Sequence, residues 1–135
     1  MKALVVICGI TNIVFTAFHI WLGLQISRMS GVPEQLHALL KMLNTGGTIF
    51  ILFLAMTLTF MAGEVVKTRL GGMILLLGAA TYLVRGAEEF IVSSAVNVPI
   101  LAACAVVGLL HLCAFVMLRC PCRQKMQDSL PEQSM

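Results

Sequence analysis

Residues 71–92 read GGMILLLGAATYLVRGAEEFIV, and this stretch decides the fold class. A membrane-spanning helix needs roughly 20 mostly apolar residues, and the stretch is long and apolar enough to supply them. Its polar and small residues recur at intervals of three and four, which places the following on one helical face: Gly78, Tyr82, Arg85, Glu89 and Ser93. We therefore predict a transmembrane helix with one polar face.

The composition extends this prediction to the whole chain. Of its 135 residues, 59% are hydrophobic and 11% charged, whereas a soluble domain averages about a quarter charged residues. Three further stretches qualify as spans: residues 3–26, 43–63 and 98–118. Short connections force consecutive spans to run antiparallel. We expect an all-α integral membrane protein, with residues 1–120 forming a four-transmembrane-helix antiparallel up-down bundle.

Basic residues outside the spans are distributed unequally between the two sides of this bundle. The side that holds both termini carries Lys2, Lys67, Arg69, Arg119, Arg123 and Lys125, and the opposite side carries Arg28 and Lys41. Because cytoplasmic loops are enriched in Lys and Arg, we expect both termini in the cytoplasm. The expected location is a multi-pass position in the plasma or inner membrane.

Two segments lie outside the spans. Residues 30–33 break the helix, and residues 33–42 then carry apolar residues at helical spacing opposite Glu34, His37 and Lys41. This predicts an amphipathic connector on the outer interface, and a lipid-facing connector is favoured over a lid or docking helix. Residues 121–135 are polar and contain Pro131, so we expect a disordered cytoplasmic tail.

Cys120 and Cys122 follow the last span between Arg119 and Arg123. Cysteines next to a membrane are candidates for S-palmitoylation in a eukaryotic cell. The interpretation as a reduced cytosolic thiol pair is simpler and is favoured. The other three cysteines lie inside apolar runs, where cysteine behaves as a small hydrophobe. We therefore predict no disulfide.

The polar residues of the spans separate by depth into two layers. The outer layer contains His19, Asn44, Tyr82, Arg85, Glu88 and Glu89, and the inner layer contains Asn12, Thr59 and His111. Arg85 can pair with Glu89 at i+4 or with Glu88 at i+3, which would leave one carboxylate near His19. The alternative is an ion pair at the interface that only fixes the depth of the helix.

The outer layer predicts an outward-facing polar pocket that binds an amphiphilic or anionic ligand, or a membrane protein partner, with Arg85 facing an anionic head group. One alternative is a small proton-coupled transporter using His19 and a glutamate. Another is a membrane enzyme that acts on a lipid with a His/Glu acid-base pair. The enzyme is disfavoured because no nucleophile is evident.

No cofactor, metal or nucleic acid is expected. His19 and His111 lie about 10 Å apart along the membrane normal, which does not suit one haem. The cysteines lie away from the outer histidines and carboxylates, so a compact metal site is not expected. The basic residues are scattered singly rather than along one face, which disfavours nucleic acid. We expect the lipid bilayer to surround the chain. No pattern in the sequence specifies its oligomeric state.

The orientation can be tested by labelling intact cells with a membrane-impermeant maleimide. In a variant whose native cysteines are replaced by alanine, a cysteine introduced as His37→Cys should react from outside, and one introduced as Lys125→Cys should react only after the cells are opened. Reaction at position 125 in intact cells would reverse the orientation.

Overall fold

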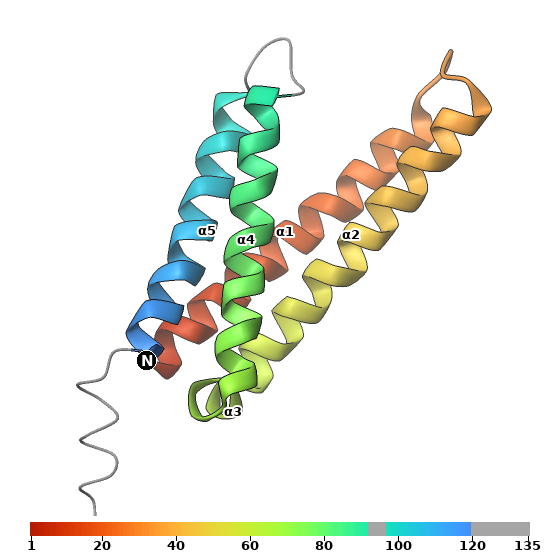
Figure 1. Ribbon diagram of the computed structural model, residues 1–135. Coiled ribbons are helices and arrows are strands. Elements are labelled where there is room, and N and C mark those ends of the chain that lie inside the picture. The colour runs from red at the N-terminus through yellow and green to blue at the C-terminus, as the bar shows by residue number, and fades with distance from the viewer. Residues whose placement is uncertain (92–96, 120–135) are drawn as a thin grey trace, which may run out of the picture. The chain divides into compact units, whose positions relative to one another are not determined.

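The computed structural model of the protein describes residues 1–91 and 97–119, most of which form helices (Figure 1). The helices are α1 (Lys2–Arg28), α2 (Glu34–Phe60), α3 (Ala62–Lys67), α4 (Arg69–Ile91) and α5 (Val98–Arg119). No strand occurs among these residues. Four of the helices they form, α1, α2, α4 and α5, are long and apolar enough to cross a membrane. The prediction of an all-α chain with four such helices is confirmed.

The chain divides into two compact units, Lys2–Val65 and the part from Val66 onward. In the first, α1 and α2 pack against each other as an antiparallel hairpin, and in the second α4 and α5 do the same. The association of both hairpins in one bundle and the cytoplasmic position of the termini stay predictions. Ser93, Cys120, Cys122 and the tail 121–135 lie outside the described residues.

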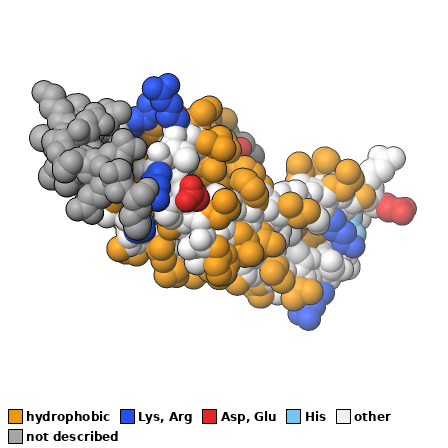
Figure 2. Space-filling view, turned by 90° about the horizontal axis from the view of Figure 1, so that it is seen from below, with side chains coloured by type: hydrophobic (Ala, Val, Ile, Leu, Met, Phe, Trp, Pro, Cys, Tyr) orange, Lys and Arg blue, Asp and Glu red, His pale blue; other side chains and the backbone are white. Residues whose placement is uncertain are grey.

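Large hydrophobic side chains lie on the outside of the helices. Figure 2 shows hydrophobic side chains over much of the face in view, and exposed examples are Val14, Ile49, Phe60, Met73 and Leu109. Soluble monomers rarely expose apolar surface on this scale, whereas lipid is a suitable neighbour for it. The distribution supports a membrane protein whose helices pack through smaller residues.

Glycine allows the paired helices to approach closely in both hairpins. A Cβ atom at Gly9 of α1 would lie 2.8 Å from the backbone nitrogen of Thr59 on α2. In the second hairpin, a Cβ atom at Gly108 would lie 2.9 Å from the side chain of Leu83. Small residues at such crossings are typical of membrane helix pairs, because close backbone approach increases van der Waals contact.

The turn between α1 and α2 is closed by backbone and histidine contacts. Gly31 has a φ of 80°, a conformation that glycine adopts without a steric cost. Pro33 then precedes the first turn of α2. The His37 Nε2 atom lies 2.7 Å from the carbonyl oxygen of Ile26, near the end of α1. This contact supplies a donor to a helix-terminal carbonyl group, which gives His37 a structural role.

The expected amphipathic connector continues directly into the second span, and its position at the outer interface stays a prediction. Residues 34–42 form the first turns of α2 without a break, because neither proline nor glycine interrupts the chain between Glu34 and Asn44. A 27-residue helix is about 40 Å long, which exceeds the roughly 30 Å hydrocarbon core. The polar residues at the start of α2 fit the part of the helix that extends beyond this core.

Gly9→Ala should destabilise the α1–α2 hairpin, because the added methyl group meets the backbone of α2, which cannot rotate away. Overpacking of this kind typically costs about 1–3 kcal/mol. The matched control is Gly46→Ala on α2, where nothing lies within 4 Å of the added atom. Thermal unfolding in detergent should show a lower midpoint for Gly9→Ala alone. Equal midpoints for the two variants would contradict the close approach.

Candidate functional site

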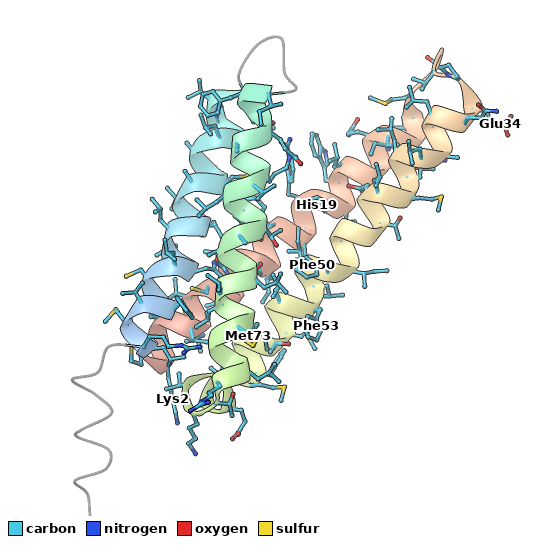
Figure 3. All side chains as sticks on the ribbon, viewed as in Figure 1. Lys2, His19, Glu34, Phe50, Phe53 and Met73 are labelled. Atoms are coloured by element: carbon cyan, nitrogen blue, oxygen red, sulfur yellow. The ribbon has the colours of Figure 1, made fainter. Side chains whose placement is uncertain are left out.

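His19 and Asn44, two residues of the expected outer layer, lie together in the α1–α2 hairpin. The His19 Nδ1 atom is 3.2 Å from the Asn44 side-chain oxygen, and the Asn44 amide group donates to the His19 carbonyl oxygen at 3.0 Å. Figure 3 labels His19 on α1. The two contacts join the helices and occupy one ring nitrogen. They favour an interhelical hydrogen bond over catalysis as the role of His19.

Two residues of the expected inner layer also lie in this hairpin. The Asn12 side-chain amide donates to the Cys8 carbonyl oxygen at 2.6 Å, one helical turn earlier. The Thr59 hydroxyl oxygen is buried and lies where the close approach to Gly9 occurs. Asn12 is fully buried. His111, the third residue of the expected inner layer, belongs to the other unit.

His111 is a buried packing residue of the α4–α5 hairpin. Its Nδ1 atom lies 2.8 Å from the Val107 carbonyl oxygen, so this nitrogen carries the proton and donates it. A Cβ atom at Gly78 on α4 would lie 2.5 Å from the His111 ring. Glycine at position 78 therefore makes room for the imidazole between the helices.

Tyr82 lies closer to His111 than the two predicted layers suggest. The centres of their rings are 5.7 Å apart, although the sequence placed Tyr82 in the outer layer and His111 in the inner one. Helical side chains lean toward the N-terminus of their own helix. Because α4 and α5 run antiparallel, the two side chains lean toward each other. The depths of the Cα atoms alone therefore suggested a larger separation between the Tyr82 and His111 side chains than the structure has.

Arg85 contacts both expected carboxylates near the end of α4. Its guanidinium group lies 2.7 Å from Glu89 and 3.7 Å from Glu88. The Glu89 side chain is 5% exposed, whereas the side chains of Arg85 and Glu88 are 47% and 51% exposed. The short contact goes to the buried partner, as the high cost of an uncompensated buried charge requires. The longer contact leaves the Glu88 carboxylate open to its surroundings.

Asn97 is a part of this cluster that the sequence interpretation did not include. Its backbone N–H donates to the second Glu89 oxygen at 3.4 Å, and its side-chain oxygen accepts from the Ile100 N–H at 3.3 Å. The side chain thus caps the start of α5, where a nearby carboxylate is electrostatically favourable. A polar Asn directly before an apolar run was the sequence signal for this cap.

A shallow, wide-open groove on one face of α4 lies beside the exposed charges. Its lining residues are Ala80, Thr81, Val84, Arg85 and Glu88. Ala80, Thr81 and Val84 lie within the two turns that precede Arg85, so their surface leads along α4 to the charged pair. The sequence interpretation had not selected these three residues because it followed the polar stripe alone.

The structure therefore divides the predicted pocket residues between two units. His19 and Asn44 lie together in one hairpin, and Tyr82, Arg85, Glu88 and Glu89 lie on α4 of the other. A pocket common to both groups stays a prediction. Among the described residues, no group of three or more His, Cys, Asp or Glu side chains could hold a metal ion.

Comparison with protein-family models, curated proteins and solved structures gives no match for this chain. Its chemistry must therefore be inferred from its own residues.

The coupling of Arg85 to each carboxylate can be measured separately. Arg85→Ala should destabilise the protein because it leaves the buried Glu89 carboxylate without its cation, and loss of one partner of a fully buried pair costs about 3–5 kcal/mol. Because the Arg85 side chain is half-exposed, we expect a smaller loss of unfolding free energy than this. Adding Glu89→Gln should recover part of the loss.

Glu88→Gln is the matched control, because an exposed pair contributes only about 0–1 kcal/mol. Thermal unfolding in detergent of the single and double variants gives both coupling energies. Equal coupling of Arg85 to the two glutamates would contradict the arrangement of one buried and one exposed partner.

Proposed function

We propose that this multi-pass membrane protein binds the polar head of an amphiphile in the groove beside Arg85 and Glu88. The observation that carries the proposal is the groove itself, in which two half-exposed groups of opposite charge lie next to Ala80, Thr81 and Val84. Charged groups in a membrane helix are costly and commonly functional. A polar head could contact the charges while an acyl chain follows the surface of α4.

The position of the charges along α4 agrees with this use. Arg85 precedes Ile91, the last residue of α4, by about 9 Å along the helix axis. If α4 spans the roughly 30 Å hydrocarbon core, we expect the guanidinium group near one interface. Lipid head groups and the first methylene groups of their chains lie at this level.

The charges of the cluster indicate which head group fits. Arg85, Glu88 and Glu89 together carry one net negative charge when ionised, so a purely anionic head group would be repelled. Arg85 has five N–H donors and can bond a phosphate in addition to Glu89. Glu88 can accept a hydrogen bond from an ammonium group. We therefore propose a zwitterionic head that contains both a phosphate and an amine.

The other two hypotheses lack a specific observation in their favour. His19 contacts Asn44 within its own hairpin, and Glu89 contacts Arg85 and Asn97 within the other. These contacts fix the positions of the side chains, and none of them joins His19 to a glutamate as a proton relay or an acid-base pair would require. A proton-coupled transporter and a lipid-modifying enzyme therefore remain alternatives without support from the site.

The proposal can be tested by native mass spectrometry of the full chain in detergent. The protein is titrated with phosphatidylethanolamine or phosphatidylcholine that have the same acyl chains. Phosphatidylethanolamine should be retained better than phosphatidylcholine, because its primary ammonium group can donate hydrogen bonds to Glu88 and its phosphate can accept from Arg85. Glu88→Gln should reduce this retention about tenfold and remove the preference over phosphatidylcholine.

The matched control is Glu34→Gln, which removes an exposed carboxylate from the first turn of α2. This variant should retain phosphatidylethanolamine as the unmodified protein does. Equal retention of phosphatidylethanolamine and phosphatidylcholine, or equal loss in the two Gln variants, would contradict the proposed function. Specific recovery of another membrane protein with no lipid preference would instead support the partner-docking alternative.

A further inference from the structure

A second groove lies at the opposite end of α4 and is independent of the Arg85 site. It is formed where α3 meets α4 and where α5 ends, and its volume is about 420 Å³. Three basic residues line it: Lys67, Arg69 and Arg119. Arg69 precedes Arg85 by about 24 Å along the helix, so the two grooves are separate.

The charged residues that the structure describes in this groove are all positive. Among residues 1–91 and 97–119, its lining contains the three basic residues and no aspartate or glutamate. All three of these side chains are exposed. Three positive charges converging on one concavity attract an anion more strongly than the same charges spread over a surface. The Arg85 groove, by contrast, contains an exposed carboxylate.

Arg119 is held in a defined position at the groove. Its guanidinium carbon lies 5.4 Å from the centre of the Phe115 ring, one turn earlier on α5. A Cβ atom at Gly72 would lie 3.7 Å from the Arg119 Nε atom, so the arginine extends toward the first turn of α4. Contact with an aromatic face restrains the guanidinium plane while leaving its edge N–H groups available.

The start of α4 adds a further positive contribution. Thr68 caps this 23-residue helix by accepting a hydrogen bond from the Gly71 N–H at 3.0 Å on its hydroxyl oxygen. The N-terminus of a helix carries a partial positive charge, which favours a negatively charged group nearby. Here it faces the same groove as the three basic side chains. The shared chemistry of the expected ligand is therefore that of a phosphate group.

The apolar part of the groove favours a lipid as the source of that phosphate. Met73 and Leu118 also line it, and Met73 is 62% exposed near the start of α4 (Figure 3). The groove lies where two membrane-crossing helices begin and end, which is the level of lipid head groups. A soluble phosphate would contact the basic side chains but would make no apolar contact with Met73 or Leu118.

We infer that the groove of Lys67, Arg69 and Arg119 binds the phosphate of an anionic phospholipid, with the first part of an acyl chain against Met73 and Leu118. The three positive charges select a head group with net negative charge over a zwitterionic one. This selectivity is opposite to that proposed for the Arg85 groove. The two sites therefore predict different lipids.

The test uses the full chain in detergent, titrated with phosphatidylglycerol or phosphatidylcholine of the same acyl chains and followed by native mass spectrometry. Phosphatidylglycerol should bind in preference. The double variant Arg69→Gln/Arg119→Gln should lose this binding by about 25-fold, since each basic group near a lipid surface contributes about a fivefold factor. The single variants should each lose about fivefold.

The matched control is Arg28→Gln/Lys41→Gln, which removes two exposed positive charges from the α1–α2 hairpin. It should change phosphatidylglycerol binding by less than about twofold, because these residues line no part of the groove. Equal loss in both double variants, or equal binding of the two lipids, would overturn the inference. If the double variant of the groove fails to fold, the single variants are compared with Arg28→Gln by the same criterion.

Inorganic phosphate distinguishes the two sources of the phosphate group. Added at the concentration of the lipid, it should not displace phosphatidylglycerol, because it cannot contact Met73 and Leu118. Displacement at equal concentration would overturn the lipid as ligand and assign a soluble phosphate to the groove.

Discussion

Close contact between helix backbones is the constraint on which each hairpin depends. In lipid, burial of large apolar side chains does not hold helices together, because the surrounding chains are equally apolar. Packing must come from positions where two helices can approach closely. Gly9 meets the backbone of Thr59 in the first hairpin, and Gly108 meets Leu83 in the second. A larger residue at either position would separate the helices and remove contacts along their length.

The same apolar surroundings explain how the buried polar residues are used. A polar group without a partner is costly in hydrocarbon, and several of these groups have a hydrogen-bond partner within their own hairpin. Thr16 and His111 contact carbonyl oxygens one turn earlier, and His19 and Asn44 contact each other. Such residues provide structure. The half-exposed charges of Arg85 and Glu88 and the basic groove at Lys67 are different, because their charged groups lie open to ligands.

The two grooves of the α4–α5 hairpin are lined by similar kinds of residue but differ in charge. Each combines charged side chains with a small apolar surface near one end of α4. Arg85 is balanced by two carboxylates, whereas no described carboxylate lines the groove of Arg69 and Arg119. A bilayer presents head groups at both of its surfaces, and the different charge balance at the two ends of α4 is the reason for proposing a different head group at each.

The sequence by itself determined the helical class, the four spans and the residues able to form the Arg85 ion pairs. These features depend on local spacing, since apolar length defines a span and an i+4 interval brings Arg85 to Glu89. Only the tertiary structure decided that Glu89 is the buried partner, that Asn97 joins it, and that Tyr82 packs on His111. It also assembled Lys67, Arg69 and Arg119, which the sequence had shown only as signals of orientation. These contacts depend on how α4 and α5 meet, and helical spacing along one chain segment carries no information about the opposing helix.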